Sequence, residues 1–149
     1  MIRKRKARVE EQHQVAFVDW FRKQHPKYAK HLTLGSFGEN VGERRMARLK
    51  QMGLTPGYPD LFLALPKMIE HHKHKRTGRN FALEEHIEIE FIGGLYIEMK
   101  TKTGIVSEQQ KEIHEMLRKY RYTVTVCRNW DEAKECISDY MNCSVFPIN

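Results

Sequence analysis

The chain has 149 residues, 40% of them hydrophobic and 30% charged, which suits one domain over residues 1–149 that needs neither disulfides nor a structural metal to fold. Its 26 Lys and Arg against 19 Asp and Glu give a formal charge of +7, which favours polyanionic partners such as nucleic acid. Three cysteines without Cys-x-x-Cys spacing argue against a disulfide framework or zinc ribbon, and no apolar run is long enough for a membrane span, so we expect a soluble cytoplasmic protein that binds no membrane.

The first predicted element is a helix over residues 9–23, preceded by a basic arm at residues 1–8. Its apolar stripe is formed by residues at helical spacing: Val15, Val18 and Phe21. Glu11 lies four residues before Val15, which places its carboxylate on this stripe. Such a carboxylate either favours the helix through the dipole at its N-terminus or needs a partner elsewhere in the folded protein.

A short helix over residues 43–52 is expected to end at Gly53, with a basic side opposite its apolar one. Its candidate phosphate contacts are Arg44, Arg45, Arg48 and Lys50, although a solvated face is the alternative interpretation. A second basic cluster extends from Lys67 to Arg79. Between the two clusters, a turn-rich segment leads into an apolar strand from Asp60 to Leu65.

Residues 67–84 read as a polar, mobile loop. The run His71-His72-Lys73-His74 has no second ligand pair at zinc spacing, so we favour a loop over a metal site. The alternation over residues 86–91 predicts a strand, and Gly93-Gly94 is expected to reverse the chain into a second strand, Leu95 to Lys100, making a hairpin.

The strand from Leu95 to Lys100 carries the most informative pattern. Its apolar residues alternate with polar ones, so Glu98 and Lys100 project from one face. If Asp60 comes beside them, two carboxylates can hold Mg²⁺ or Mn²⁺ while Lys100 faces a phosphate. The alternatives are a turn aspartate at position 60 and a surface ion pair between positions 98 and 100.

The remaining elements complete an α/β domain with a central mixed sheet flanked by helices. Ser107 is a predicted N-cap for a helix to about Tyr120, and Ser107-x-x-Gln110 is also the pattern of a capping box. A strand over residues 122–127 and a helix over residues 130–141 follow.

Four blocks of the sequence together resemble the VRR-NUC family of the PD-(D/E)XK nuclease superfamily, in the compact single-domain form found in phage. These blocks are Glu11-x-x-Gln14, Gly57-Tyr58-Pro59-Asp60-Leu61, Gly94-Leu95-Tyr96-Ile97-Glu98-Met99-Lys100, and Gly104 with Ser107 and Gln110. The resemblance implies a restriction-endonuclease-like fold and a Mg²⁺- or Mn²⁺-dependent endonuclease that cleaves DNA to leave 5′-phosphate ends. It also implies a homodimer that prefers branched DNA.

The same resemblance assigns roles to individual residues. Asp60, Glu98 and the backbone carbonyl of Met99 would ligate the metal, and Lys100 would orient or activate the attacking water. Glu11 would complete the acidic site by holding a second ion or a metal-bound water.

Gln110 would touch Lys100 or the scissile phosphate, and Lys102 would join the basic residues of the short helix in contacting DNA. Two other functions stay open: a noncatalytic nucleic-acid-binding module, and a nuclease subunit that needs a partner.

Overall fold

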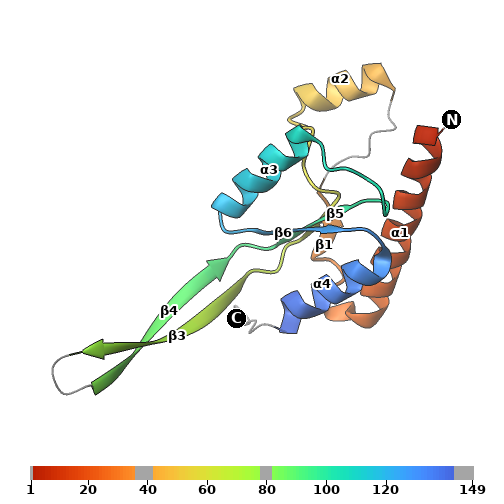
Figure 1. Cartoon of the computed structure of the whole chain (residues 1–149). Coiled ribbons are helices and arrows are strands. Elements are labelled where there is room, and N and C mark those ends of the chain that lie inside the picture. Colours follow the sequence, from red (N-terminus) through yellow and green to blue (C-terminus); the bar gives the residue numbers. More distant parts are fainter. Residues whose placement is uncertain (1, 36–41, 78–81, 143–149) are drawn as a thin grey trace.

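The computed structural model describes residues 2–35, 42–77 and 82–142, and its centre is a four-stranded mixed sheet. The strands stand in the order β1 (Leu32–Leu34), β2 (Leu61–Leu63), β5 (Leu95–Met99) and β6 (Thr123–Cys127). β2 is antiparallel to both β1 and β5, whereas β6 runs parallel to β5. The sheet is therefore mixed, as the sequence predicts (Figure 1).

Helices flank this sheet. α1 (Ile2–Gln24) and α4 (Trp130–Asn142) pack against each other and against the sheet, while α3 (Glu108–Lys119) packs against β6 on the other side. A short 3-10 helix, η1 (Pro26–Tyr28), follows α1, and α2 (Glu43–Gln51) lies near the N-terminal end of α3. The backbone of residues 2–8, predicted to be a basic arm, is part of α1.

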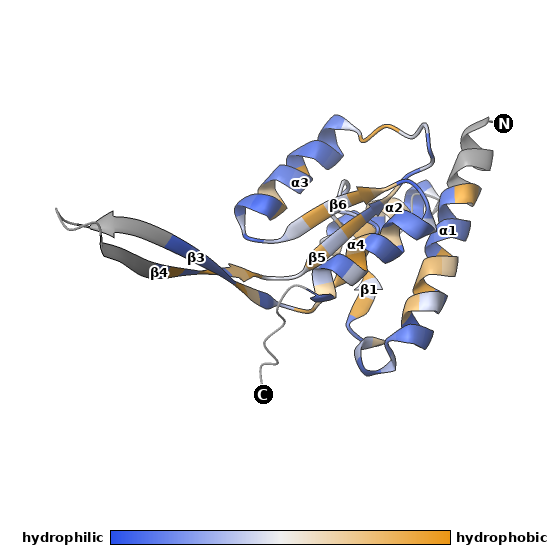
Figure 2. Cartoon of the chain, turned by 60° about the horizontal axis from the view of Figure 1, so that its bottom comes forward, coloured by the Kyte–Doolittle hydropathy of each residue, from blue (hydrophilic) through white to orange (hydrophobic). Residues whose placement is uncertain are grey.

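The core lies between the sheet and the pair α1 and α4. Alternate residues of the two central strands point into it, and Leu63, Leu95 and Ile97 are fully buried there. Phe17 and Phe21 of α1 are also fully buried. Figure 2 shows hydrophobic colour on β1, on β6 and along parts of α1, and hydrophilic colour over most of α3. Among the described residues, no helix is both long and apolar enough to cross a membrane.

The segment predicted to be a polar loop at residues 67–84 is instead a long hairpin, so that prediction is wrong. β3 (Lys67–Thr77) pairs with β4 (Ala82–Ile92) as an antiparallel two-stranded sheet that projects from the domain (Figure 1). Its polar residues satisfy one another across the strands: Lys73 Nζ lies 2.5 Å from Glu88 Oε2, and His71 Nε2 lies 3.1 Å from Glu90 Oε2. Such cross-strand pairs stabilise a polar hairpin without a core beneath it.

The predicted hairpin through Gly93 and Gly94 is also wrong, because β4 pairs with β3, and β5 pairs with β2 and β6. The two glycines instead allow close packing where the chain passes from the hairpin into the central sheet. A Cβ on Gly93 would lie 2.9 Å from the ring of Tyr122. A Cβ on Gly94, whose φ is +155°, would lie 2.7 Å from the ring of Phe62.

Lys67 fixes the base of the hairpin to α4. Its side chain is only 6% exposed, its Nζ donates a hydrogen bond to the Tyr140 carbonyl at 3.2 Å, and it lies 4.0 Å from the centre of the Tyr140 ring. The Tyr140 hydroxyl in turn donates to the Leu65 carbonyl at 2.8 Å. Lys67 therefore has a structural role and does not contribute to the predicted basic surface.

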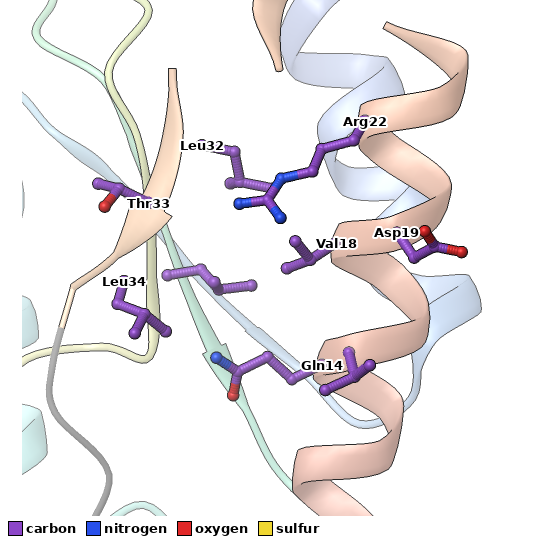
Figure 3. A pocket seen from close by; sticks show the side chains of 9 residues that line it. Gln14, Val18, Asp19, Arg22, Leu32, Thr33 and Leu34 are labelled. Carbon is purple, nitrogen blue, oxygen red and sulfur yellow. The ribbon is translucent and has the colours of Figure 1, made fainter. Parts of the chain in front are cut away.

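A groove separates α1 from the edge strand β1 (Figure 3). Its cavity is about 420 Å³. On one side it is lined by Gln14, Val15, Val18, Asp19 and Arg22, and on the other by Leu32, Thr33, Leu34 and Leu61. None of the predicted metal ligands lines this groove, so it is separate from the acidic site.

Candidate active site

β5 places a carboxylate and an ammonium on one face of the sheet. Glu98 is 1% exposed and Lys100 is 14% exposed, and Lys100 Nζ lies 2.5 Å from Glu98 Oε1. The two side chains share a face because they are two residues apart at a strand end. The sequence prediction that joined them is confirmed, and their burial excludes a surface ion pair.

Asp60 reaches the same place from the neighbouring strand. Leu61 pairs with Ile97, which brings the preceding Asp60 level with Glu98. The position is fixed because the Met99 amide donates to Asp60 Oδ2 at 2.7 Å, and the Gly35 amide donates to the Asp60 carbonyl at 2.9 Å. Asp60 therefore holds the backbone of β5 as well as adding a second carboxylate to the site.

Gln110 forms the capping box that its spacing from Ser107 predicts, and it also contacts a residue of the site. Its backbone amide donates to Ser107 Oγ at 3.3 Å, and its Oε1 accepts from the Ser107 amide at 3.0 Å, so the capping box at the start of α3 is present. Its Nε2 donates to Glu98 Oε1 at 2.5 Å. Gln110 thus contacts the carboxylate of Glu98, whereas the sequence interpretation had placed it against Lys100 or a phosphate.

The environment of Glu98 disfavours its negative charge. Burial, together with the nearby charge of Asp60, raises the pKa of Glu98 to about 7, although its hydrogen bond to Lys100 opposes the change. Burial lowers the pKa of Lys100, but its hydrogen bond to Glu98 and the charges of Glu98, Asp60 and Glu10 outweigh burial and raise it. The negative charges of Glu98 and Asp60 repel each other in this partly buried site, and a bound cation would offset that repulsion.

The two carboxylate oxygens of Glu98 differ in their hydrogen bonding. Lys100 and Gln110 both donate to Oε1, whereas the buried Oε2 accepts no hydrogen bond. His114 Nε2 lies 3.7 Å from this oxygen and is also without a hydrogen-bond partner, and burial lowers the pKa of His114. An unsatisfied carboxylate oxygen beside a second carboxylate fits a divalent metal ligand.

These carboxylates do not form a complete protein cage. Within residues 2–35, 42–77 and 82–142, no group of three His, Cys, Asp or Glu side chains is arranged to hold a metal. Asp60 and Glu98 could supply two oxygen ligands, and the Met99 carbonyl and waters could supply the others. Magnesium usually keeps several waters and binds through one or two carboxylates, so this donor set fits it.

The carboxylate that α1 contributes is Glu10, and the placement of Glu11 on the buried stripe is wrong. Glu11 is exposed, and Val15, which defined the predicted stripe, is 68% exposed. The buried face instead carries Phe17 and Phe21, which are 7 and 11 residues after Glu10 and so lie at nearly the same angle around the helix. Glu10 Oε1 accepts a hydrogen bond from the Thr101 amide at 2.8 Å.

Two further residues that the sequence did not single out support the site. His114 lies one turn after Gln110 on α3, so its spacing of four residues could have indicated a shared face. Arg128 Nη1 donates to the carbonyls of Thr101, Lys102 and Gly104 at 3.2, 3.3 and 2.9 Å. Arg128 therefore holds the turn that follows Lys100.

The predicted DNA contacts lie on exposed surface. Arg44, Arg45, Arg48 and Lys50 are all exposed on α2, which buries none of its residues. Lys102 is exposed in the turn after β5. These side chains are therefore available to phosphates, in contrast to Lys67.

The chain matches the family model of the VRR-NUC domain over residues 8–131. A solved structure described as a VRR_NUC domain protein has a TM-score of 0.66 and 22% identity, over 93% of this chain and 92% of the other. No curated protein sequence matches the chain. The mixed sheet with flanking helices fits a restriction-endonuclease-like α/β fold, and the family match covers β2, β5 and α3, which carry the acidic site. The chain belongs to the VRR-NUC family of nucleases.

Proposed function

We propose that this protein is a Mg²⁺- or Mn²⁺-dependent endonuclease that hydrolyses DNA phosphodiester bonds, with a site of the PD-(D/E)XK type. The proposal rests on the burial and hydrogen bonding of Glu98. It is 1% exposed, its Oε1 accepts hydrogen bonds from Lys100 and Gln110, and its Oε2 accepts none. Leaving a buried carboxylate oxygen unsatisfied costs about 1–3 kcal/mol or more, and a bound cation would remove that cost.

The proposed metal ligands are Asp60, Glu98 and the Met99 carbonyl. When bound, the divalent ion would act as a Lewis acid on the phosphate and lower the pKa of a water nucleophile. Lys100 is held beside the ligands by Glu98 and would steady the charge that develops on the phosphate. Gln110 orients Glu98, and Glu10 orients the backbone next to Lys100.

The DNA would be held by phosphate contacts from α2 and from Lys102. The exposed side chains of Arg44, Arg45, Arg48 and Lys50 support this, since basic side chains supply most nonspecific affinity for DNA. Such contacts weaken as salt rises, which gives the proposal a simple check.

The finer proposal is a homodimer that prefers branched DNA, because cutting two strands requires two centres held apart. The hairpin supports self-association, since one face of β4 exposes Ile87, Ile89 and Phe91 by 49%, 64% and 52%. Apolar residues gathered on one face in this way are typical of protein interfaces. Light scattering at micromolar concentration would give the mass of a dimer, and a monomeric mass with a four-way junction bound would refute this part.

An electrophoretic panel tests the nuclease proposal. Linear, nicked, flap and four-way-junction substrates are incubated with Mn²⁺ or with a chelator. We expect cleavage only with Mn²⁺ and fastest on branched substrates. Binding without cleavage under every condition would favour the noncatalytic module, and cleavage that appears only when a partner is added would favour the subunit.

A further inference from the structure

Four aromatic rings cover part of the sheet face that carries the acidic site. We call this group the aromatic floor: Tyr58, Phe62, Tyr96 and Tyr122. Phe62 and Tyr96 pair across β2 and β5, and their rings stack with centroids 4.4 Å apart. Tyr58 and Tyr122 meet Tyr96 edge-on, at 6.2 and 5.5 Å. The four rings therefore pack against one another as one cluster.

The floor adjoins the proposed metal ligands. Tyr58 is two residues before Asp60 in the chain. Tyr96 is two residues before Glu98 on β5, and residues two apart in a strand share a face. A strand of DNA with a phosphate at the acidic site would thus have neighbouring nucleotides over the floor.

The floor differs from the hydrophobic core in its exposure. All four of its rings are partly exposed, whereas Leu61, Leu95 and Ile97 on the opposite face are buried to within 1%. Three of the four rings are tyrosines, so the floor also carries hydroxyl groups. The floor thus combines exposed ring surface with polar tips.

A basic helix, α2, precedes the floor in the chain. The chain from α2 to Tyr58 is short, and at Gly57 it packs on the start of α3, where an added Cβ would lie 3.0 Å from the Gln109 carbonyl. A short segment therefore connects α2, with its exposed arginines, to Tyr58 at one end of the floor. Rings beside basic side chains are the usual combination in sites for single-stranded nucleic acid.

We propose that the aromatic floor stacks the bases of an unpaired DNA segment next to the scissile phosphate, so that the substrate is a junction between duplex and single strand. This inference rests on the proposed nuclease function. Bases in a duplex are already stacked on one another, whereas unpaired bases present free faces to tyrosine rings. The floor therefore selects unpaired DNA whatever its sequence.

The test measures binding without catalysis. Fluorescein-labelled oligothymidylate and a blunt duplex are titrated with protein in EDTA, and anisotropy gives both dissociation constants. Tyr58→Leu and Tyr96→Leu keep apolar bulk but remove the ring, and Tyr120→Leu is the matched control because Tyr120 is 67% exposed and outside the floor. We expect each floor variant to weaken oligothymidylate binding about tenfold, with duplex binding and the control changed less than about twofold.

An unchanged affinity of folded floor variants for oligothymidylate would overturn the proposal, as would an equal loss for duplex. If the leucine variants do not fold, 5-iodouracil photocross-linking of the wild-type protein replaces them. Cross-links mapped by mass spectrometry to Tyr58, Phe62, Tyr96 or Tyr122 support the floor, and cross-links only elsewhere refute it. Because neither readout needs turnover, a protein that binds in this way but never cleaves would refute the nuclease proposal alone.

Discussion

Replacing Glu10 and Glu11 one at a time tests the assignment of the acidic residue on α1. Glu10 Oε1 accepts from the Thr101 amide at 2.8 Å, next to Lys100, whereas Glu11 is exposed. A hydrogen bond to a charged group contributes about 1.5–3 kcal/mol, and about 2 kcal/mol is appropriate for this partly buried one. If that energy positions Lys100 during the reaction, Glu10→Ala lowers the rate about 30-fold, because 1.36 kcal/mol corresponds to a factor of ten.

The assay is single-turnover DNA cleavage at saturating Mn²⁺, with urea unfolding of each variant as a second readout. Glu11→Ala makes the same chemical change at the adjacent position, and we expect it to change the rate by less than about threefold and stability by less than about 0.5 kcal/mol. A large loss in Glu11→Ala with none in Glu10→Ala would refute the placement of the helix face. Equal losses of cleavage rate in both variants would show that the rate depends on the negative charge of α1 and not on the hydrogen bond of Glu10.

Three further predictions concern Glu98, Lys100 and Gly57. The pKa of Glu98 is about 7 in the folded protein against an ordinary 4.5, so metal-free stability should fall as pH rises between these values. We expect the unfolding free energy of the wild type to fall by about 3 kcal/mol over this range, and that of Glu98→Gln to lack this fall. Urea unfolding from pH 4 to pH 8 measures both, and parallel pH profiles of the wild type and Glu98→Gln would contradict the prediction. Lys100→Ala should retain Mn²⁺ binding by calorimetry but cleave more slowly in a single turnover, and a wild-type rate would exclude its catalytic role. Gly57→Ala should lower the unfolding free energy by about 1–2 kcal/mol, since Gly57 has φ +96° and lies against the backbone of Gln109; unchanged thermal unfolding would contradict this.

The parts of the site that depend on local pattern could be predicted from the sequence. Alternation in β5 placed Glu98 and Lys100 on one face, and the spacing of Ser107 and Gln110 indicated the capping box that the structure contains. Each of these inferences needs only the periodicity of one element. The contact between Gln110 and Glu98 needs the packing of α3 against the sheet, which local pattern does not specify.

The errors arose where several patterns competed or where partners lie far apart in the chain. The predicted stripe of α1 joined Val15 and Val18 to Phe21, whereas the buried face carries Phe17 and Phe21, because the larger side chains bury more apolar surface. The hairpin looked like a loop because its histidines, lysines and glutamates are polar. Their partners, such as Glu88 for Lys73, lie on the other strand and are found only once the register is known.

The central claim is that Asp60 and Glu98 hold a divalent metal with which this nuclease cuts DNA. The most direct measurement is cleavage of supercoiled plasmid by the wild-type protein and by Glu98→Ala, purified in parallel, across a Mn²⁺ titration with an EDTA control. We predict nicked and linear products that appear with Mn²⁺ in the wild type and are absent in EDTA and in Glu98→Ala. Undiminished cleavage by folded Glu98→Ala, or cleavage by the wild type in EDTA, would contradict the claim.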